Sequence, residues 1–591
     1  MRKAMIGRTN SRRKTPIDGV ILLFICIVLS SLGAYATDVN TTIDVHNQTN
    51  LSYKILTGIN LGGAHLSYSD LSYANLANSN LSRALLKSSR LVGTNLSRAS
   101  LRETDLSGAE LIGCELIEAN LSYADLKRSH INKTILQRSN LTGTALVAAE
   151  IINSDLGSAA LAGADLSRCS IVNSTLQGAK LCNANLVLAI ISNANLAKTD
   201  LSGSILRDAI LFETNMSGSN LEGADCTGMT FEKADLTKAY VNKTILQRSN
   251  LTGTALVAAE IIDSDLGFAA LAGADLRRCN IVNSTLLGAK LSNANLAFAI
   301  ISNANLSGTD LSGANLKDAK LSEINMHGSN LSGADCTGMI MEDADLRGAD
   351  LTGARLVNAD MNGIDISGAS LVNANMQGAR LNYANLSGSY LYNGVFTRAE
   401  FSGADLRGAD LGGSDLARTR MMWADLGEAN LNDANLDYSD LTGANLTGAS
   451  LQRASYTNSI LERANLNRAD LKGANLSDIK LDGTYMREAD LRMNSIRDAV
   501  FINVDLSKAK LQGVTLDECR LVHVNLTGAD LTGASLKNVD MRDVNLKSAN
   551  LAKMQCDSVT LDQIASGSAN GDINLDGAIL SDDLSARIVP Q

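Results

Sequence analysis

The sequence predicts an all-β solenoid, and three observations lead to this prediction. An apolar residue recurs at every fifth position from Leu61 to Leu561, without insertion or deletion. The only two prolines, Pro16 and Pro590, stand near the ends of the chain. A continuous backbone hydrogen-bond ladder excludes proline from its interior, because proline has no N–H to donate. Aromatic residues make up 4% of the chain, and so biased a composition is typical of repeat proteins.

A period of five residues fits neither a helix nor a flat strand. In an α-helix, five residues advance the chain by about 500°, so the stripe of leucines would wind around the surface. In a strand, successive leucines would point to opposite sides. A chain that turns a corner every five residues instead points each central residue (position 0) and the small residue two before it (position −2) inward. Glycine is frequent at position +2, which suits a turn with positive φ.

The repeats have a consistent consensus. Position −2 is usually alanine and position −1 is usually aspartate or asparagine, as in Ala74-Asn75-Leu76, Ala164-Asp165-Leu166, Ala404-Asp405-Leu406 and Ala529-Asp530-Leu531. These units resemble the A(D/N)LXX unit of the pentapeptide-repeat family over about residues 51–561. The resemblance implies a right-handed quadrilateral β-helix with four pentapeptides in each coil. Representative predicted core centres are Leu76, Leu166, Leu406, Leu446 and Leu531.

The first 36 residues have the order of a secretory signal. Basic residues cluster in the first 14 positions, the apolar run Val20–Leu29 follows, and the small residues Ala34 and Ala36 precede a predicted cleavage site. The alternative is an uncleaved N-terminal membrane anchor over residues 20–36, a short one, since a span needs roughly 17–25 residues. We therefore expect a secreted or extracytoplasmic protein, with membrane contact only through this N-terminal helix if it is not cleaved.

Further segments follow from the register of the repeats. Residues 37–60 lack the small–Asp/Asn–Leu signature and are predicted to form a leader or N-terminal cap. The pentapeptide β-helix proper is predicted over residues 61–561. Within it, residues 132–241 recur as residues 242–351, an internal duplication. Four pentapeptides in each coil would divide the duplicated segment into five and a half coils, so we expect the two copies to present equivalent residues on opposite faces.

Residues 562–591 are predicted to form a C-terminal cap and tail. The segment Thr560–Gln563 has the spacing of a capping box, and Gly567 is a candidate helix stop. A short helix at this point would cover the open edge of the last coil, which would otherwise be prone to aggregation. Leu575 and Leu580 continue the leucine pattern with the register shifted by one position.

The sequence contains no recognisable catalytic or metal-binding motif. No two of its five histidines are separated by the four repeats of one coil, and it has no HExxH motif, nucleophile elbow or phosphate-binding glycine loop. The aspartates beside the leucines are better explained as a repeated surface feature. The net charge of −10 lacks the basic balance that nucleic-acid binding needs. We therefore predict no enzyme, no cofactor, no metal and no nucleic acid.

The cysteines that follow residue 36 are predicted to be buried thiols. Cys226, Cys336 and Cys556 occupy position 0, four others occupy position −2, and only Cys182 stands at an outward position. No two of them are separated by the four repeats that would stack one on the other, so the spacing does not indicate a disulfide framework.

Outward aromatic residues are the best candidates for contact sites. Tyr53 and Tyr73 are separated by four repeats and are expected to stack on one face, and Trp423 is the only tryptophan. The sequence favours a non-enzymatic extracytoplasmic structural or protein-interaction scaffold with an unknown protein or cell-surface partner. The alternative, implied by the resemblance, is a DNA-mimicking pentapeptide protein that binds gyrase and protects topoisomerases. The export signal and the dilute negative charge argue against this alternative.

Overall fold

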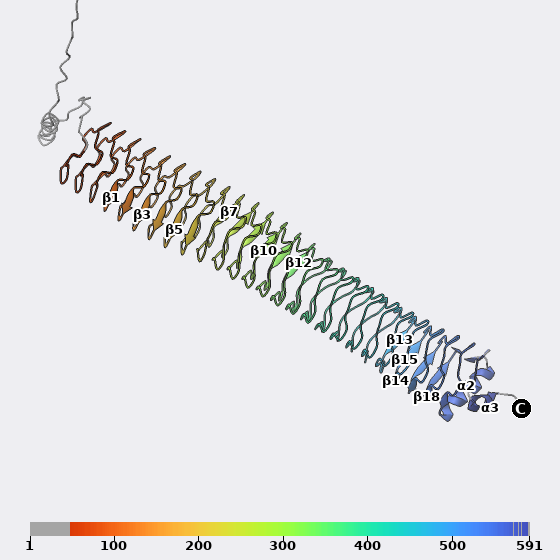
Figure 1. Cartoon of the computed structure of the whole chain (residues 1–591). Helices are drawn as coiled ribbons and strands as arrows, with labels where there is room; N and C mark the ends of the chain where they lie inside the picture. Colours follow the sequence, from red (N-terminus) through yellow and green to blue (C-terminus); the bar gives the residue numbers. More distant parts are fainter. Residues whose placement is uncertain (1–47, 571–572, 577, 581, 589–591) are drawn as a thin grey trace, which may run out of the picture. The chain divides into compact units, whose positions relative to one another are not determined.

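The computed structural model describes residues 48–570, 573–576, 578–580 and 582–588. The chain divides into two compact units, Met1–Ala255 (unit 1) and Leu256–Gln591 (unit 2). In each unit, the described residues form a stack of β-helical coils (Figure 1).

The predicted N-terminal segments lie largely outside the described residues. The signal peptide or anchor, with Ala34 and Ala36, lies outside the described residues, as does the leader up to residue 47. Within the described ranges, no helix combines the length and the apolar character needed to cross a membrane.

Each coil contains four pentapeptides, as the resemblance implied. Parallel bridges join residues at position −1 to the equivalent residue four repeats later, from Asn50 with Asp70 in unit 1 to Asp530 with Asn550 in unit 2. The four faces are named here by their central residues. In each unit, faces A, B, C and D contain every fourth central residue counted from Leu51, Leu56, Leu61 and Leu66, respectively.

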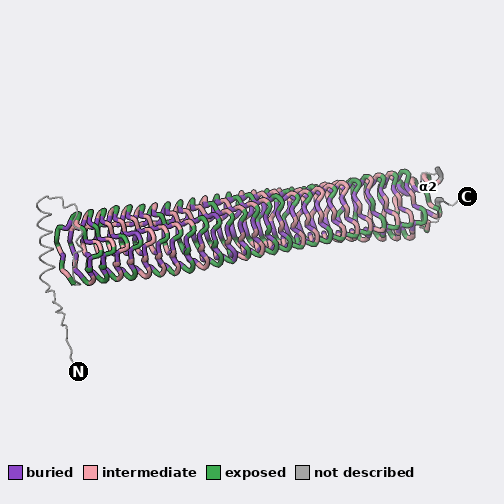
Figure 2. The backbone as a smooth tube through the Cα atoms, turned by 90° about the horizontal axis from the view of Figure 1, so that it is seen from above, coloured by how far each residue is buried: buried purple, intermediate pink, exposed green. Residues whose placement is uncertain are grey.

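The central residues fill the interior of the coils, as predicted. Leu76, Leu166, Leu406 and Leu446 have no exposed surface, and Leu531 is 2% exposed. Buried and exposed residues therefore alternate along every coil (Figure 2). Burying one leucine stabilises the fold by about 1.5–3 kcal/mol, less than the roughly 5–10 kcal/mol of backbone entropy lost by a five-residue unit. Stability therefore depends on hydrogen bonds and packing between stacked coils.

Every backbone N–H of a standard repeat has a defined acceptor. The N–H groups at positions 0 and +2 donate to the next coil, as from Leu51 to Asp70 O (2.7 Å) and from Tyr53 to Ser72 O (2.9 Å). The N–H at position −1 donates to the preceding coil, and the N–H at position −2 donates to the carbonyl of the preceding central residue. The corner residue at position +2 has positive φ, for example 68° at Gly448. The turn predicted from glycine at this position is thereby confirmed.

The remaining N–H, at position +1, explains the aspartate or asparagine at position −1. Its acceptor is the side-chain Oδ1 of that residue, as from Ser107 to Asp105 (2.9 Å) and from Thr447 to Asn445 (3.2 Å). This local hydrogen bond closes a turn around the central residue. Where position −1 carries another residue type, this acceptor is missing and the backbone can extend into a short strand.

Most strands begin at such a position, although many other positions without Asp or Asn, including Glu115 and Lys180, form only isolated bridges. Face A of unit 1 carries six parallel strands in sequential order, β1 Glu110–Ile112, β2 His130–Asn132, β3 Glu150–Ile152, β4 Ser170–Val172, β5 Ile190–Ser192 and β6 Ile210–Phe212. None begins with aspartate or asparagine. The next strand of unit 1, β7 Tyr240–Asn242, lies on face C instead. The duplication accounts for the change of face. β7 lies at the junction of the two copies, and the strands that follow it are the copies of β3 to β6, displaced by two faces because the offset between the copies includes a half coil.

In unit 2, the first strands also lie on face C. Its face C carries β8 Glu260–Ile262, β9 Asn280–Val282, β10 Ile300–Ser302, β11 Lys320–Ser322 and β12 Ile340–Glu342, paired in parallel in that order. Four of the five begin without aspartate or asparagine, and β9 is the exception. The strand position thus follows the local sequence of each copy.

The last coils of unit 2 carry strands on two adjacent faces. Face C holds β13 Lys480–Asp482, β15 Val500–Ile502, β17 Arg520–Val522 and β19 Asp540–Arg542, while face B holds β14 Ser495–Arg497, β16 Thr515–Asp517, β18 Ser535–Lys537 and β21 Gln555–Cys556. Valine replaces alanine at several −2 positions here, including Val514 and Val524. An apolar cavity of about 20 Å³, lined by residues from Leu491 to Ile564, lies in the interior of these coils.

Helix α2 (Ser558–Asn570) forms the predicted short C-terminal cap, although its predicted ends are wrong. The N-cap is Asp557, whose Oδ1 accepts the N–H of Thr560 at 2.8 Å, so the helix begins before the predicted capping box. Gly567 lies inside the helix and does not stop it. Its missing side chain makes room for Ile573, since a Cβ at this position would come within 2.8 Å of Ile573 Cδ1.

The cap covers the edge of the last regular coil with side-chain acceptors. The N–H groups of Asn538, Val539 and Met541 donate to Asp557, to Thr560 Oγ1 (3.2 Å) and to Gln563 Oε1 (3.3 Å), respectively. After the helix the ladder resumes, with β20 Val544–Asn545 paired to β22 Ile573–Asn574. Asn545 pairs with Asn574, so the cap makes this coil longer than a regular one and shifts the register of the later leucines. The tail also contains helix α3, Asp582–Ile588.

Gly394→Ala should destabilise unit 2 by more than an ordinary corner substitution. Gly394 occupies an inward −2 position, and a Cβ there would meet the ring of Phe396, which packs edge-to-face on Phe401 at 5.8 Å. We expect a loss of about 1–3 kcal/mol from overpacking, measured by urea unfolding. In a Phe396→Leu background, the same substitution should cost much less. An equal loss in both backgrounds would contradict this packing.

Candidate functional site

Many of the polar side chains at position −1 are engaged in the fold itself. Beyond capping its own turn, Asn445 donates from Nδ2 to Oδ1 of Asp425 in the preceding coil at 2.8 Å. The same ladder joins Asn430 to Asp410 at 2.7 Å. The numerous aspartates and asparagines at position −1 therefore have a structural role in each coil.

The predicted stack of Tyr53 and Tyr73 is present at the start of unit 1. The ring centroids are 4.9 Å apart and the ring planes differ by 16°. The ring of Tyr73 in turn lies over Gly93, the equivalent residue of the following coil, where a Cβ would come within 2.6 Å of the ring. An aromatic residue at position +2 therefore leans onto the next corner. Tyr53 and Tyr73 are 72% and 54% exposed, respectively.

Trp423 belongs to an alternating column of aromatic residues and glycines. Position +2 of face C in unit 2 carries, in five consecutive coils, Gly363, Tyr383, Gly403, Trp423 and Gly443. Each ring lies over the glycine of the next coil, so that a Cβ on Gly403 would come within 2.7 Å of Tyr383, and a Cβ on Gly443 would clash with Trp423. Tyr383 is 77% exposed and Trp423 is 60% exposed. The glycines both seat the rings and separate them by two coils.

A second column on the same face alternates with the same period. Position −1 carries Asp360, Arg380, Glu400, Arg420 and Asp440 in the same five coils. Arg380 Nη1 lies 2.8 Å from Asp360 Oδ2, and Arg420 Nη1 lies 3.5 Å from Glu400 Oε1. Each arginine thus shares its coil with one of the two aromatic residues. We call Arg380, Tyr383, Arg420 and Trp423 the Arg–aromatic row.

Sequence reasoning identified Trp423 but not this row. The signal is visible only when the sequence is read two coils at a time, because the five-residue consensus carries no information on which residues alternate between coils.

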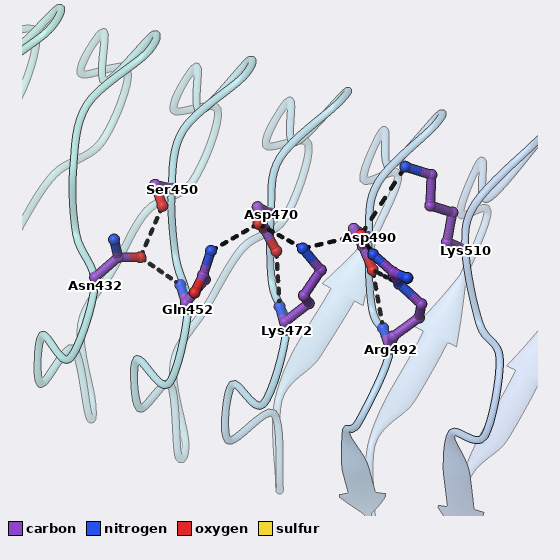
Figure 3. Close-up of polar contacts among 8 residues, drawn as sticks. All are labelled: Asn432, Ser450, Gln452, Asp470, Lys472, Asp490, Arg492 and Lys510. Atoms are coloured by element: carbon purple, nitrogen blue, oxygen red, sulfur yellow. Dashed lines mark hydrogen bonds and ion pairs between the residues drawn. The ribbon is translucent and has the colours of Figure 1, made fainter.

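A charge cluster around one buried aspartate lies on face A of unit 2 (Figure 3). Asp490 is 7% exposed, and its Oδ2 lies 2.7 Å from Arg492 Nη2, 3.4 Å from Lys472 Nζ and 4.0 Å from Lys510 Nζ. Burial alone would raise the pKa of Asp490. Hydrogen bonds from Arg492 and the charges of Arg492 and Lys472 outweigh it and hold this pKa below its ordinary value.

The cluster continues a polar ladder from the preceding coils. Asn432 accepts hydrogen bonds from the Ser450 hydroxyl and the Gln452 N–H, both at 2.8 Å. Gln452 Nε2 donates to Asp470 at 2.9 Å, and Lys472 Nζ lies 3.1 Å from Asp470. Except for the Lys472–Asp470 contact within one repeat, these bonds run from coil to coil, so the cluster is suited to holding neighbouring coils together.

The buried thiols are poor nucleophiles. Burial raises the pKa of Cys114, Cys169, Cys279 and Cys336 to about 12, so these groups stay protonated at neutral pH. The described cysteines are free, and Cys182 is half-buried as an outward residue. Cys556 is also half-buried, contrary to the prediction for a central residue, because the chain leaves the coil for helix α2 directly after it. Among the described residues, no group of three or more His, Cys, Asp or Glu could hold a metal ion.

Comparisons with known proteins give a family but no specific function. The family model described as pentapeptide repeats matches successive segments between residues 47 and 553. No curated protein matches the chain significantly. HetL, a pentapeptide repeat protein involved in heterocyst differentiation regulation from the cyanobacterium Nostoc sp. strain PCC 7120, is 29% identical. The match covers 36% of this chain and 89% of HetL, with a TM-score of 0.21.

Two further solved structures are similar over part of the chain. A form of QnrB1, a plasmid-mediated fluoroquinolone resistance protein, is 20% identical over 34% of this chain and 91% of its own, with a TM-score of 0.23. A pentapeptide repeat protein from the Arabidopsis thaliana thylakoid lumen is 27% identical over 19% of this chain and 66% of its own, with a TM-score of 0.10. The repeat matches extend over most of the sequence, and the chain therefore belongs to the pentapeptide-repeat family.

Proposed function

We propose that this protein is a non-enzymatic structural or protein-interaction scaffold that works outside the cytoplasm. The observation that carries the proposal is that different side chains of each repeat serve folding and the surface. Side chains at positions −2, −1 and 0 form the core and close the turn, while those at positions +1 and +2 point outward at every corner. Such a stack can present different side chains along its faces without changing its core.

The location rests on the order of residues at the N-terminus. The basic residues, the apolar run Val20–Leu29 and the small residues Ala34 and Ala36 favour export. A scaffold outside the cytoplasm meets proteins or polymers of the cell surface, which an extended repeated surface can contact at several coils. The alternative, a gyrase-binding DNA mimic, requires the mature chain in the cytoplasm.

Cell fractionation of the full chain tests the location. We expect the protein in the extracytoplasmic fraction, with mass spectrometry giving either a mature terminus after Ala36 or an intact, membrane-bound chain. The matched control is the double variant Leu22→Arg, Leu23→Arg, which interrupts the apolar run and should keep the protein in the cytoplasm. An intact, soluble wild-type chain in the cytoplasm would contradict export and favour the gyrase-binding alternative.

A further inference from the structure

We propose that the N-terminal end of unit 1 contacts the headgroup region of an anionic lipid bilayer. This inference rests on the proposed function, because a chain that is exported through its N-terminal segment meets a membrane. The contact surface belongs to the first complete coil, residues 49–68 (coil 1). It is formed by Tyr53, Lys54, Ile55 and Tyr68, and we call these four residues the tip.

Coil 1 ends the ladder with unused hydrogen-bond donors. In a standard coil, the N–H at position −1 donates to the preceding coil, as from Asn75 to Lys54 O at 2.8 Å. Among the described residues, the corresponding N–H groups of Ile55, Asn60 and His65 have no acceptor. An open ladder edge of this kind is prone to pair with another molecule. The phosphate and ester oxygens of lipid headgroups are acceptors that such N–H groups can use.

The tip also exposes aromatic and aliphatic side chains at this edge. Tyr53, Ile55 and Tyr68 are 72%, 75% and 57% exposed, respectively. Tyr73 covers one face of the Tyr53 ring, and the opposite face is directed away from the second coil. The residue equivalent to Ile55 in the second coil is the polar Asn75. Tyrosine is enriched at membrane–water interfaces, where its ring lies in the apolar layer and its hydroxyl group reaches water.

Lys54 occupies an inward position, yet it is exposed. It stands at position −2, where the second coil has Ala74 with 1% exposure. A lysine at this position in a middle coil would bury its ammonium group without a partner. In coil 1 the long side chain can leave the interior through the open end, because no described coil covers it. The ammonium group therefore reaches the surface formed by Tyr53 and Ile55, where it can attract a phosphate.

The charge of the first two coils fits an anionic surface. Residues 49–88 contain three basic residues, Lys54, Arg83 and Lys87, and a single acidic residue, Asp70. The whole chain has the opposite balance, with a net charge of −10. Lysine and arginine side chains near a membrane are attracted by anionic lipids, whereas an excess of acidic groups is repelled. This distribution favours an end-on contact through coil 1.

The predicted N-terminal segment brings coil 1 close to a membrane. The apolar run ends at Leu29, and the predicted cleavage site follows Ala36. If the segment stays as an anchor, residues 37–48 connect it to coil 1 and span at most about 40 Å. So short a connection favours even a weak contact of the tip, because the contact becomes intramolecular. After cleavage, the tip would bind reversibly through its own side chains.

A second apolar pair in unit 1 provides a matched control. Leu188 and Ile190 are 44% and 48% exposed, respectively. They lie on the side of the stack, where the ladder is complete, since Ile190 pairs with both Ser170 and Ile210. Substituting this pair removes exposed apolar surface and leaves the open end unchanged.

Tryptophan fluorescence of the purified full chain tests where the protein meets the bilayer. Trp423, the only tryptophan, is replaced in a Trp423→Phe background. A new tryptophan is introduced either by Tyr53→Trp at the tip or by Tyr123→Trp, at a corner roughly 14 Å further along unit 1 at about 4.8 Å per coil. All chains carry Leu22→Arg and Leu23→Arg, so that the apolar run does not anchor them.

The probes are vesicles of equal parts phosphatidylcholine and phosphatidylserine with brominated acyl chains, which quench tryptophans that enter the bilayer interface. We expect saturable quenching of the Tyr53→Trp chain and none of the Tyr123→Trp chain. In the Tyr53→Trp chain, Lys54→Gln should weaken vesicle binding about fivefold. The double variant Ile55→Ser, Tyr68→Ser should weaken it about tenfold. The control Leu188→Ser, Ile190→Ser should leave it unchanged.

Two outcomes would overturn the proposal. One is equal quenching of the two tryptophan positions, including no quenching of either, and the other is equal binding by the tip variant and the control variant. Circular dichroism verifies that each variant keeps its β-helix. Because purified protein and vesicles are used, quenching by a chain found in the cytoplasm would refute only the proposed location. An exported chain without quenching would refute only the membrane contact.

The competing occupant of the open end is a second copy of this chain, since two ladder edges can pair. Light scattering of the chain without vesicles distinguishes it, and we expect a monomer. A dimer that Ile55→Ser, Tyr68→Ser disrupts and Leu188→Ser, Ile190→Ser preserves would assign the tip to self-association and refute the membrane contact.

Discussion

Leu446→Arg is expected to destabilise unit 2 by more than about 4 kcal/mol, whereas the neighbouring Thr447→Arg is expected to change its stability by about 1 kcal/mol or less. Leu446 has no exposed surface and is stacked between the equivalent residues Leu426 and Leu466 of the adjoining coils. An arginine there would place a charge in an apolar interior without a partner. The coil would have to open, which would also break its ladder to both neighbours.

Thr447 is the matched control, because it directly follows Leu446 in the sequence but occupies an outward position. Its hydroxyl donates only to Asn445 Oδ1 of its own repeat, at 2.6 Å, and its side chain lies outside the core. A long arginine at this position can extend into water. Urea unfolding followed by circular dichroism compares the two variants with the wild type. Equal losses of stability would show that the inward and outward positions are misassigned.

The sequence predicts the repeat because four of its five positions each have a local role. The inward leucine and the small residue before it form the core, Asp or Asn at position −1 closes the turn, and glycine at position +2 accepts positive φ. These tasks recur without insertion, so the inward positions and corners follow from the period alone. The four-sided coil came from the family resemblance, because the five-residue period itself does not say how many repeats close one turn.

Features that depend on neighbouring coils were harder to predict. The Asp490 cluster and the Arg–aromatic row join residues of successive coils, which are far apart in the sequence and whose pairing the five-residue consensus does not specify. Most strands begin where Asp or Asn is missing at position −1, but other positions that lack these residues, such as Glu115 and Lys180, form no strand, so this signal alone does not place the strands. At the C-terminus, Asp557 caps the helix, and Gly567 makes room for Ile573, a contact outside the helix that local stop signals cannot reveal.

Asp490→Asn is expected to destabilise its coils at neutral pH by about 1.5–3 kcal/mol, the range for hydrogen bonds to a charged group. Asp490 is the shared anion of Arg492, Lys472 and Lys510, and its side chain is 9% exposed. The matched control is Asp433→Asn, which removes the partner of Arg453 at 2.7 Å, although this aspartate side chain is 53% exposed. An exposed pair contributes only about 0–1 kcal/mol, because water screens it.

The pH dependence of the stability difference between the wild type and Asp490→Asn tells whether the charge of Asp490, and not the shape of its side chain, stabilises the coils. The folded-state pKa of Asp490 is lowered, so its contribution is fully present above the unfolded-state pKa of about 3.9 and is lost as the pH falls through the folded-state value. Protonated aspartate resembles asparagine, so the gap between the wild type and Asp490→Asn should close in acid. Hydrogen exchange of peptides covering residues 470–510, measured at neutral pH and in urea-containing buffer near pH 3, follows this gap locally. A gap that persists unchanged in acid, or one no larger than that of Asp433→Asn at neutral pH, would mean that the buried cluster does not hold these coils together through its charge.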